Sequence, residues 1–295
     1  MSQRVRMFSS LLSLLVFSQI ADAQDTLVWK FRAQETLQYT VKQTMKTSMD
    51  IGGNKINQDM NQSMDMAWNV QSVAASGDVV MSQVVRRIQM NMAGGPAGEV
   101  EFDTNNTQKS DNPIVNSMGD VFRKIVNQPF TVSMKPTGEI TNVEVPNQLL
   151  EAVRQSAAGA TGALDENTLK QMMKQSAVTL PGQPVSPKNS WTSTQNVQLP
   201  FGTMNIRSTM TYLEKDSAGN ALIDVVPEIT VTPKEGAPVK MTLKNSSGRG
   251  QVTFNIAQGR VAKSQLDLTL TMTIETGGQT FNQTIEQTTA MALAQ

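Results

Sequence analysis

The stretch LDLTLTMTIETGGQTFNQTIEQTTAMAL (266–293) alternates apolar and polar side chains along most of its length. Its first half places one set of apolar residues on a single strand face: Leu266, Leu268, Leu270, Met272 and Ile274. A period of two is typical of an antiparallel strand with one buried face. Gly277-Gly278 then predicts a tight turn. The segment therefore predicts a β-hairpin with one apolar face.

A second hairpin of the same kind is predicted near the beginning of the chain. Its strands flank Gly52-Gly53, and its returning strand, INQDMNQSMDMAW (56–68), resembles FNQTIEQTTAMAL (281–293) residue by residue. Two further pairs of turn-and-strand phrases resemble each other: those that follow residues 75–77 and 217–219, and those at 132–140 and 252–261. Recurring phrases of this kind predict an internal duplication.

The middle of the chain changes to a helical period. Asp111-Asn112-Pro113 is a favourable helix start, and the apolar residues that follow predict a helix over 113–127 that ends before Pro129. Further helices are predicted after Pro146 and after Asp165.

These patterns divide the chain into five parts. We expect a signal peptide (1–23), an N-terminal β half (24–145), a helical insert (146–179), a proline-rich linker (180–190) and a C-terminal β half (191–295). The predicted fold class is mainly β with an α insert. We expect one or more long, curved antiparallel sheets that are built from two related halves, with helices covering one face.

The first residues predict export. Arg4 and Arg6 precede a short apolar run, and small residues at Ala21 and Ala23 suit cleavage between Ala23 and Gln24. The run is too short to span a membrane as a helix. We therefore expect a periplasmic or secreted protein that is not a transmembrane protein.

The composition argues against several functional classes. The chain has 25 basic and 25 acidic residues, so no charge excess indicates a nucleic-acid partner. It contains neither histidine nor cysteine, which removes the common catalytic triads and zinc ligands. No nucleotide-binding motif follows a predicted strand. We expect no catalytic residues, no cofactor and no enzyme activity.

Methionine suggests one metal. The chain has 19 methionines, and Met60, Met64 and Met66 share one face of a predicted strand. Thioethers prefer Cu(I), so a soft-metal site is one hypothesis. Methionine also fills apolar cores, and the equivalent positions of the second hairpin hold Ile285, Thr289 and Met291. This drift favours an ordinary apolar face, and we predict no metal site.

Several features together carry a family resemblance. They are the predicted signal peptide, the Met- and Gln-rich first hairpin, the phrase PFTVSMKPTGEITNVEV (129–145), the helical insert and LPGQPVSPKNSW (180–191). The chain resembles the exported bacterial β-rich proteins of domain of unknown function 6263. That resemblance implies no activity and no site residues. A more distant likeness, at the level of fold alone, is to half-barrel lipoprotein carriers of bacterial envelopes.

The leading functional hypothesis is a site for a lipid or another apolar ligand. A long antiparallel sheet curls, and the predicted helices could cover its concave face around a ligand. The predicted lining residues are Met118, Val121, Phe122, Ile125, Met172 and Met173. The alternatives are a structural or protein-interaction module without a small ligand and, third, Cu(I) binding.

Overall fold

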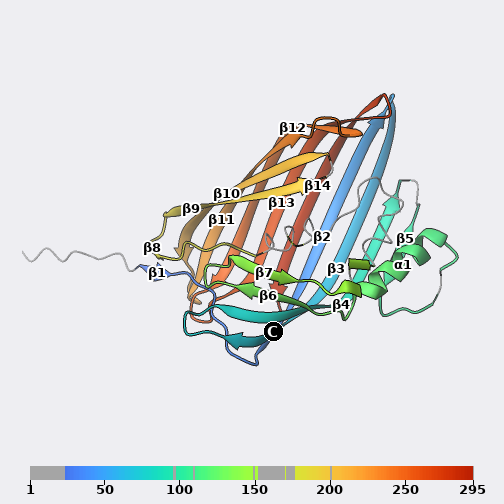
Figure 1. Ribbon diagram of the computed structural model, residues 1–295. Coiled ribbons are helices and arrows are strands. Elements are labelled where there is room, and N and C mark those ends of the chain that lie inside the picture. The colour runs from blue at the N-terminus through green and yellow to red at the C-terminus, as the bar shows by residue number, and fades with distance from the viewer. Residues whose placement is uncertain are drawn as a thin grey trace, which may run out of the picture.

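A computed structural model gives the fold (Figure 1). It describes residues 24–95, 98–108, 110–148, 150–151, 170, 177–199 and 201–294, without the side chains of Ile114 and Met118. Most of these residues belong to one antiparallel sheet of twelve strands. A small sheet pairs β1 (Asp25–Thr26) with β8 (Pro184–Val185).

The large sheet contains long strands in its middle and shorter ones toward one edge. In the first half of the chain they are β2 (Thr36–Ile51), β3 (Asn54–Val73), β4 (Val79–Gly94), β5 (Val100–Asp103), β6 (Phe130–Met134) and β7 (Ile140–Glu144). In the second half they are β9 (Ser190–Leu199), β10 (Gly202–Lys215), β11 (Asn220–Pro233), β12 (Val239–Asn255), β13 (Arg260–Thr276) and β14 (Gln279–Leu293). One helix, α1 (Pro113–Ile125), connects β5 to β6.

The two halves of the chain meet in the middle of the sheet. The strand order is β7-β6-β4-β3-β2-β14-β13-β12-β11-β10-β9, with β5 paired to β4. The first long strand and the last therefore pair with each other, from Asp50 opposite Asn282 to Tyr39 opposite Leu293. The edges β7 and β9 do not pair, so the sheet is curved but not closed.

The register defines two faces. Directly opposed residues of an antiparallel pair point to the same side, so one face can be followed across the strands. We call the face that carries Tyr39 the inner face and the opposite one the outer face. Met66 opposes Tyr39 on β3, and Leu293 opposes it on β14. The alternation seen in the sequence is the alternation between these faces.

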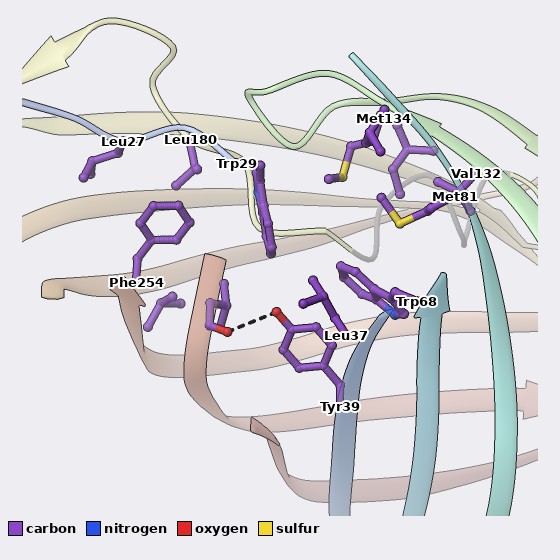
Figure 2. Close-up of a cluster of buried hydrophobic side chains, with 14 of the residues drawn as sticks. Leu27, Trp29, Leu37, Tyr39, Trp68, Met81, Val132, Met134, Leu180 and Phe254 are labelled. Carbon is purple, nitrogen blue, oxygen red and sulfur yellow. Dashed lines mark hydrogen bonds between the residues drawn. The ribbon is translucent and has the colours of Figure 1, made fainter. Parts of the chain in front are cut away.

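The core lies where one end of the sheet curls around the base segment, residues 27–31 (Figure 2). Trp29 is 2% exposed and stands between Trp68 and Phe254, with ring centroids 6.0 and 5.8 Å away. Tyr39 is buried beside Trp68, and its hydroxyl donates to the carbonyl of Val261 at 3.1 Å. Burial of these rings on several strands holds this end of the sheet together.

Toward its other end the sheet divides between β11 and β12. Their pairing stops at Val225 opposite Gly250, although β11 continues to pair with β10 as far as Pro233. Pro227 lies just beyond this point and has no backbone N–H to donate to a neighbouring strand. A Cβ atom on Gly248 would lie 2.6 Å from the Pro227 ring, so glycine permits the close approach of the two strands. Beyond this point β9, β10 and β11 run at an angle to the long strands (Figure 1).

The structure confirms the predicted fold class. The expected helix forms over Pro113–Ile125 and packs at the β5 edge, where the rings of Phe122 and Phe102 lie 5.6 Å apart. Arg123 lies over the Phe102 ring at 5.5 Å. The third predicted helix lies almost wholly outside the described residues.

The recurring phrases occupy two kinds of position in the strand order. The matched turns, β3–β4 with β10–β11 and β6–β7 with β12–β13, are offset by half of the sheet. The matched hairpins, β2–β3 and β13–β14, are neighbours. A duplication of half the sheet would produce the offset seen for the matched turns. The duplication and the five-part division of the chain stay predictions.

Candidate functional site

The inner face of the described strands carries almost no charge. At all but one of the in-register inner positions of the described strands the side chain is apolar, glycine or an uncharged polar residue. The exception is Lys215, which opposes the buried Ala221 at the base end of β10 and forms an ion pair with Asp25. One row runs from Gln62 through Gln43, Thr289 and Leu266 to Gly250. The other charged residues of the large sheet lie on the outer face or at bulges. Burying an unpaired charged side chain costs much free energy, whereas burying a glutamine or threonine side chain costs far less.

Methionine is sorted to the same face. Every methionine in a described strand points inward: Met45, Met49, Met60, Met64, Met66, Met81, Met90, Met92, Met134, Met204, Met210, Met241, Met272 and Met291. Those nearest the base are in the core, and most of those farther along the strands are only partly buried. The long strands therefore present a flexible apolar surface beyond the core.

A cavity of about 340 Å³ lies on this inner face, which we call the inner pocket. One wall comes from β9, β10 and β11, and the other from β12, β13 and β14. Its apolar lining is Ala177, Val178, Ile206, Met210, Val225, Pro227, Ile229, Val252, Leu266 and Leu268. Its polar lining is Thr179, Ser193, Gln195, Ser208, Ser264, Gln265 and Thr289. The volume falls within the range of small-ligand sites.

The strap, residues 177–180, closes one side of the inner pocket and bridges the two edges of the sheet. The N–H of Leu180 donates to the carbonyl of Thr137, in the turn between β6 and β7, at 2.8 Å. On the other edge, Trp191 of β9 donates from its indole to the carbonyl of Thr179 at 2.9 Å. Trp29 donates to the carbonyl of Val178 at 3.1 Å. The pocket wall is thus fixed by main-chain carbonyls and two indoles.

Charged groups on either side of the base segment in the sequence form contacts outside the inner pocket. Arg260 and Glu35 form an ion pair at 3.1 Å, with exposed side-chain fractions of 13% and 17%. Asp25 accepts hydrogen bonds from Tyr212 at 2.6 Å and from Lys215 at 2.5 Å. Burial raises the pKa of Asp25, but these two hydrogen bonds outweigh it and hold the pKa below the ordinary value of 3.8. Asp25 is therefore ionised at neutral pH.

Of the predicted lining residues, the three that the structure describes in full, Val121, Phe122 and Ile125, are not among those that line the inner pocket. Phe122 packs against Phe102 and the β5 cluster, and Val121 and Ile125 lie half-buried on the same helix. The side chain of Met118, together with Met172 and Met173, lies outside the described residues. These residues therefore stay a prediction. The pocket lining on β9–β14 was not predicted from the sequence. The available signal was the alternation of apolar and polar residues along these strands.

The three methionines of the copper hypothesis all lie on the inner face of β3. The register adds two closer neighbours to Met60, because Met45 opposes it on β2 and Met92 opposes it on β4. Met92 accepts a hydrogen bond from the amide of Gln58 at 3.5 Å. Among the described residues, no group of acidic side chains is placed to hold a metal ion.

In the described part of the chain, no helix is both long and apolar enough to cross a membrane. Comparison with curated protein sequences finds no match.

Comparison with solved structures finds chains of low sequence identity to this one. A structure of lipid–protein interactions in lipovitellin has a TM-score of 0.51 and 9% identity, over 90% of this chain and 26% of that one. This chain thus spans about a quarter of the lipovitellin chain. An outer membrane channel from Pseudomonas putida F1 has a TM-score of 0.26 and 6% identity, over 90% of this chain and 97% of that one. Of these two likenesses, the one to lipovitellin bears on the fold.

The family match covers much more of the sequence than any single motif. Residues 76–261 match the family of unknown function DUF6263. The matched region runs from the turn before β4 to the start of β13 and so includes α1, the strap and most of the inner-pocket lining. The chain belongs to the family of unknown function DUF6263.

Proposed function

We propose that the protein binds an apolar or amphipathic, lipid-like ligand on the inner face of its sheet, without catalysing a reaction on it. The observation that carries this proposal is the sorting of side chains. Apart from Lys215 at the base end, the inner face of the described strands carries only apolar and uncharged polar side chains, and it continues past the core at the base. A surface of this kind is characteristic of a ligand or partner site.

The inner pocket is the best-defined part of that surface. It has apolar side chains on both walls and a few hydroxyl and amide groups, which is the usual composition of a small-ligand site. Methionines continue the surface across β2, β3 and β4. Because methionine side chains adapt to different shapes, such a face suits ligands of variable chain length.

The lipovitellin likeness is consistent with this proposal at the level of architecture. That structure concerns lipid–protein interactions, and its similarity to this chain supports a common type of curved sheet. At 9% identity it carries no information about a ligand. The proposal therefore rests on the side chains of this protein.

The proposal includes export. Residues 1–23 have the sequence pattern of a signal peptide and lie outside the described residues. We place the mature protein in the periplasm or outside the cell. Sequencing of the N-terminus of protein recovered from the periplasmic fraction would test this placement, with Gln24 expected as the first residue.

Native mass spectrometry tests the binding function. Protein purified without detergent is expected to carry a bound lipid, seen as a mass increment that organic extraction removes. Extracted material would then be identified by tandem mass spectrometry. A protein that is always recovered at its polypeptide mass, and that also takes up no lipid from added vesicles, would contradict the proposal.

A role without a small ligand is the second candidate. The opening between β11 and β12 leaves strand edges that do not pair with each other, and Val226 at this position is 42% exposed. Exposed strand edges are used in protein–protein contacts. A lipid-free protein that recovers a defined partner through this edge would favour this candidate.

The third candidate is Cu(I) binding by Met45, Met60 and Met92. Directly opposed residues on adjacent strands have Cβ atoms about 5 Å apart, so three flexible thioethers in one row could reach one soft ion. A Cu(I) titration should compare the wild type with two triple leucine variants, one at these residues and one at Met60, Met64 and Met66. Equal affinities in all three proteins would dispose of the metal site.

A further inference from the structure

We propose that the inner pocket selects a neutral amphipathic lipid, with an uncharged hydroxyl, ester or amide head group, over a lipid with an ionised head group. This inference rests on the proposed function and names its ligand class. It follows from the placement of charge across the whole sheet. The apolar lining alone would accept the acyl chain of either kind of lipid.

No charged side chain lines the inner pocket among the described residues. The nearest charged residues in the strands that form it point to the outer face. Arg249 of β12 pairs there with Asp224 of β11 at 3.0 Å. Asp267 of β13 accepts hydrogen bonds on the same outer side from Thr288 and Gln265. These charges already have partners and lie across the sheet from the pocket.

The polar groups of the pocket are neutral. Ser208 and Ser193 oppose each other on β10 and β9, while Ser264 and Thr289 lie on the facing wall. Hydroxyl groups both donate and accept hydrogen bonds, so they can satisfy a glycerol, ester or amide head group. They cannot neutralise a carboxylate or a phosphate. An ion bound there would lose its hydration without gaining a counter-charge.

Two lipids with the same acyl chain, one with a neutral and one with an ionised head group, test this preference. The assay measures displacement of a fluorescent apolar probe, N-phenyl-1-naphthylamine, from the full mature chain at pH 8, below the critical micelle concentrations. Monolauroylglycerol is expected to displace the probe with an affinity at least about tenfold higher than that of laurate, because only laurate brings a charge. The lauroyl chain is common to both ligands.

A charge placed in the pocket should reverse this preference. Ser208→Lys puts a cation on the inner wall, and it is expected to improve laurate binding by about tenfold while weakening monolauroylglycerol. Ser247→Lys is the matched control, because Ser247 is exposed on the outer face of β12. If Ser208→Lys does not fold, Ser193→Lys on the edge strand β9 makes the same test.

The outcomes distinguish this inference from the function on which it rests. Equal binding of laurate and monolauroylglycerol to the wild type would overturn the neutral-ligand inference and leave lipid binding intact. An unchanged preference in a folded lysine variant would also overturn it. Failure of the probe and of both lipids to bind would instead contradict the proposed function.

Discussion

The indole nitrogen of Trp191 donates a hydrogen bond of 2.9 Å to the carbonyl oxygen of Thr179. The preceding carbonyl, that of Val178, accepts from the indole of Trp29 at 3.1 Å. Trp191 belongs to the edge strand β9, whereas Trp29 belongs to the base segment at the core. Two consecutive carbonyls of the strap are thus fixed from opposite sides. The strap is therefore as much a part of the core as of the inner pocket.

Trp29→Phe is expected to destabilise the protein more than Trp68→Phe. Both rings are buried, but the Trp68 indole nitrogen has no hydrogen-bond partner among the residues that the structure describes, whereas that of Trp29 donates to the carbonyl of Val178. Loss of a buried hydrogen bond costs about 1 kcal/mol beyond the loss of ring volume that both variants share. Urea unfolding of the two variants measures the difference. A smaller effect at Trp29 would show that the strap contact contributes nothing to stability.

Gly138→Ala is expected to be strongly destabilising. Gly138 has a φ of +84°, and a Cβ atom there would lie 2.2 Å from the carbonyl oxygen of Val178 and 2.9 Å from the Trp29 indole nitrogen. Gly219→Ala is the control, since Gly219 has a similar φ of +79° and a Cβ atom there would have no atom of the described residues within 4 Å. Alanine strains the backbone at both positions by about 1 kcal/mol.

Only Gly138→Ala also displaces the strap, which adds roughly 1–3 kcal/mol of steric cost. Thermal unfolding of both variants, each compared with the wild type, isolates this second contribution. Equal losses of stability in the two variants would mean that displacing the strap at this point costs no free energy.

Asp25 makes stability depend on acid pH. Its pKa in the folded protein is below the ordinary value of 3.8, so its stabilising contribution is complete above that value. The contribution is lost as pH falls through the lowered folded-state pKa. Asp25→Asn is therefore expected to cost about 1–2 kcal/mol at pH 7, where the ionised group binds Lys215 and Tyr212.

The gap in unfolding free energy between Asp25→Asn and the wild type should shrink as the pH is lowered below 3.8. Urea unfolding at a series of pH values measures it. A gap that stays constant, or that widens in acid, would show that the carboxylate is not what stabilises this contact.

Much of the fold follows from local patterns in the sequence. Alternation with glycine pairs at 52–53 and 277–278 predicts the two central hairpins, which occupy neighbouring positions in the sheet. The cap before Pro113 predicts α1. Both features are decided within a few residues, which is the distance over which alternation, turns and capping act.

The candidate site depends on contacts between distant residues and was less predictable. In the sequence, Pro227 and Gly248 look like ordinary interruptions of a strand. In the structure, they lie just beyond the point where β11 stops pairing with β12. Leu266 and Leu268 belong to the predicted apolar face, but they line a pocket only because β9–β11 provide a second wall opposite β12–β14. Which apolar face is covered is a property of tertiary packing, and periodicity carries no information about it.

Binding of N-phenyl-1-naphthylamine to two phenylalanine variants tests the central claim most directly. Ser208 lines the inner pocket, whereas Ser247 is exposed on the outer face, so Ser208→Phe fills the site and Ser247→Phe applies the same change elsewhere. Fluorescence titration of both folded variants and the wild type should show at least about a tenfold loss of affinity for Ser208→Phe alone. Probe affinity that is equal in all three proteins would contradict a ligand site on the inner face.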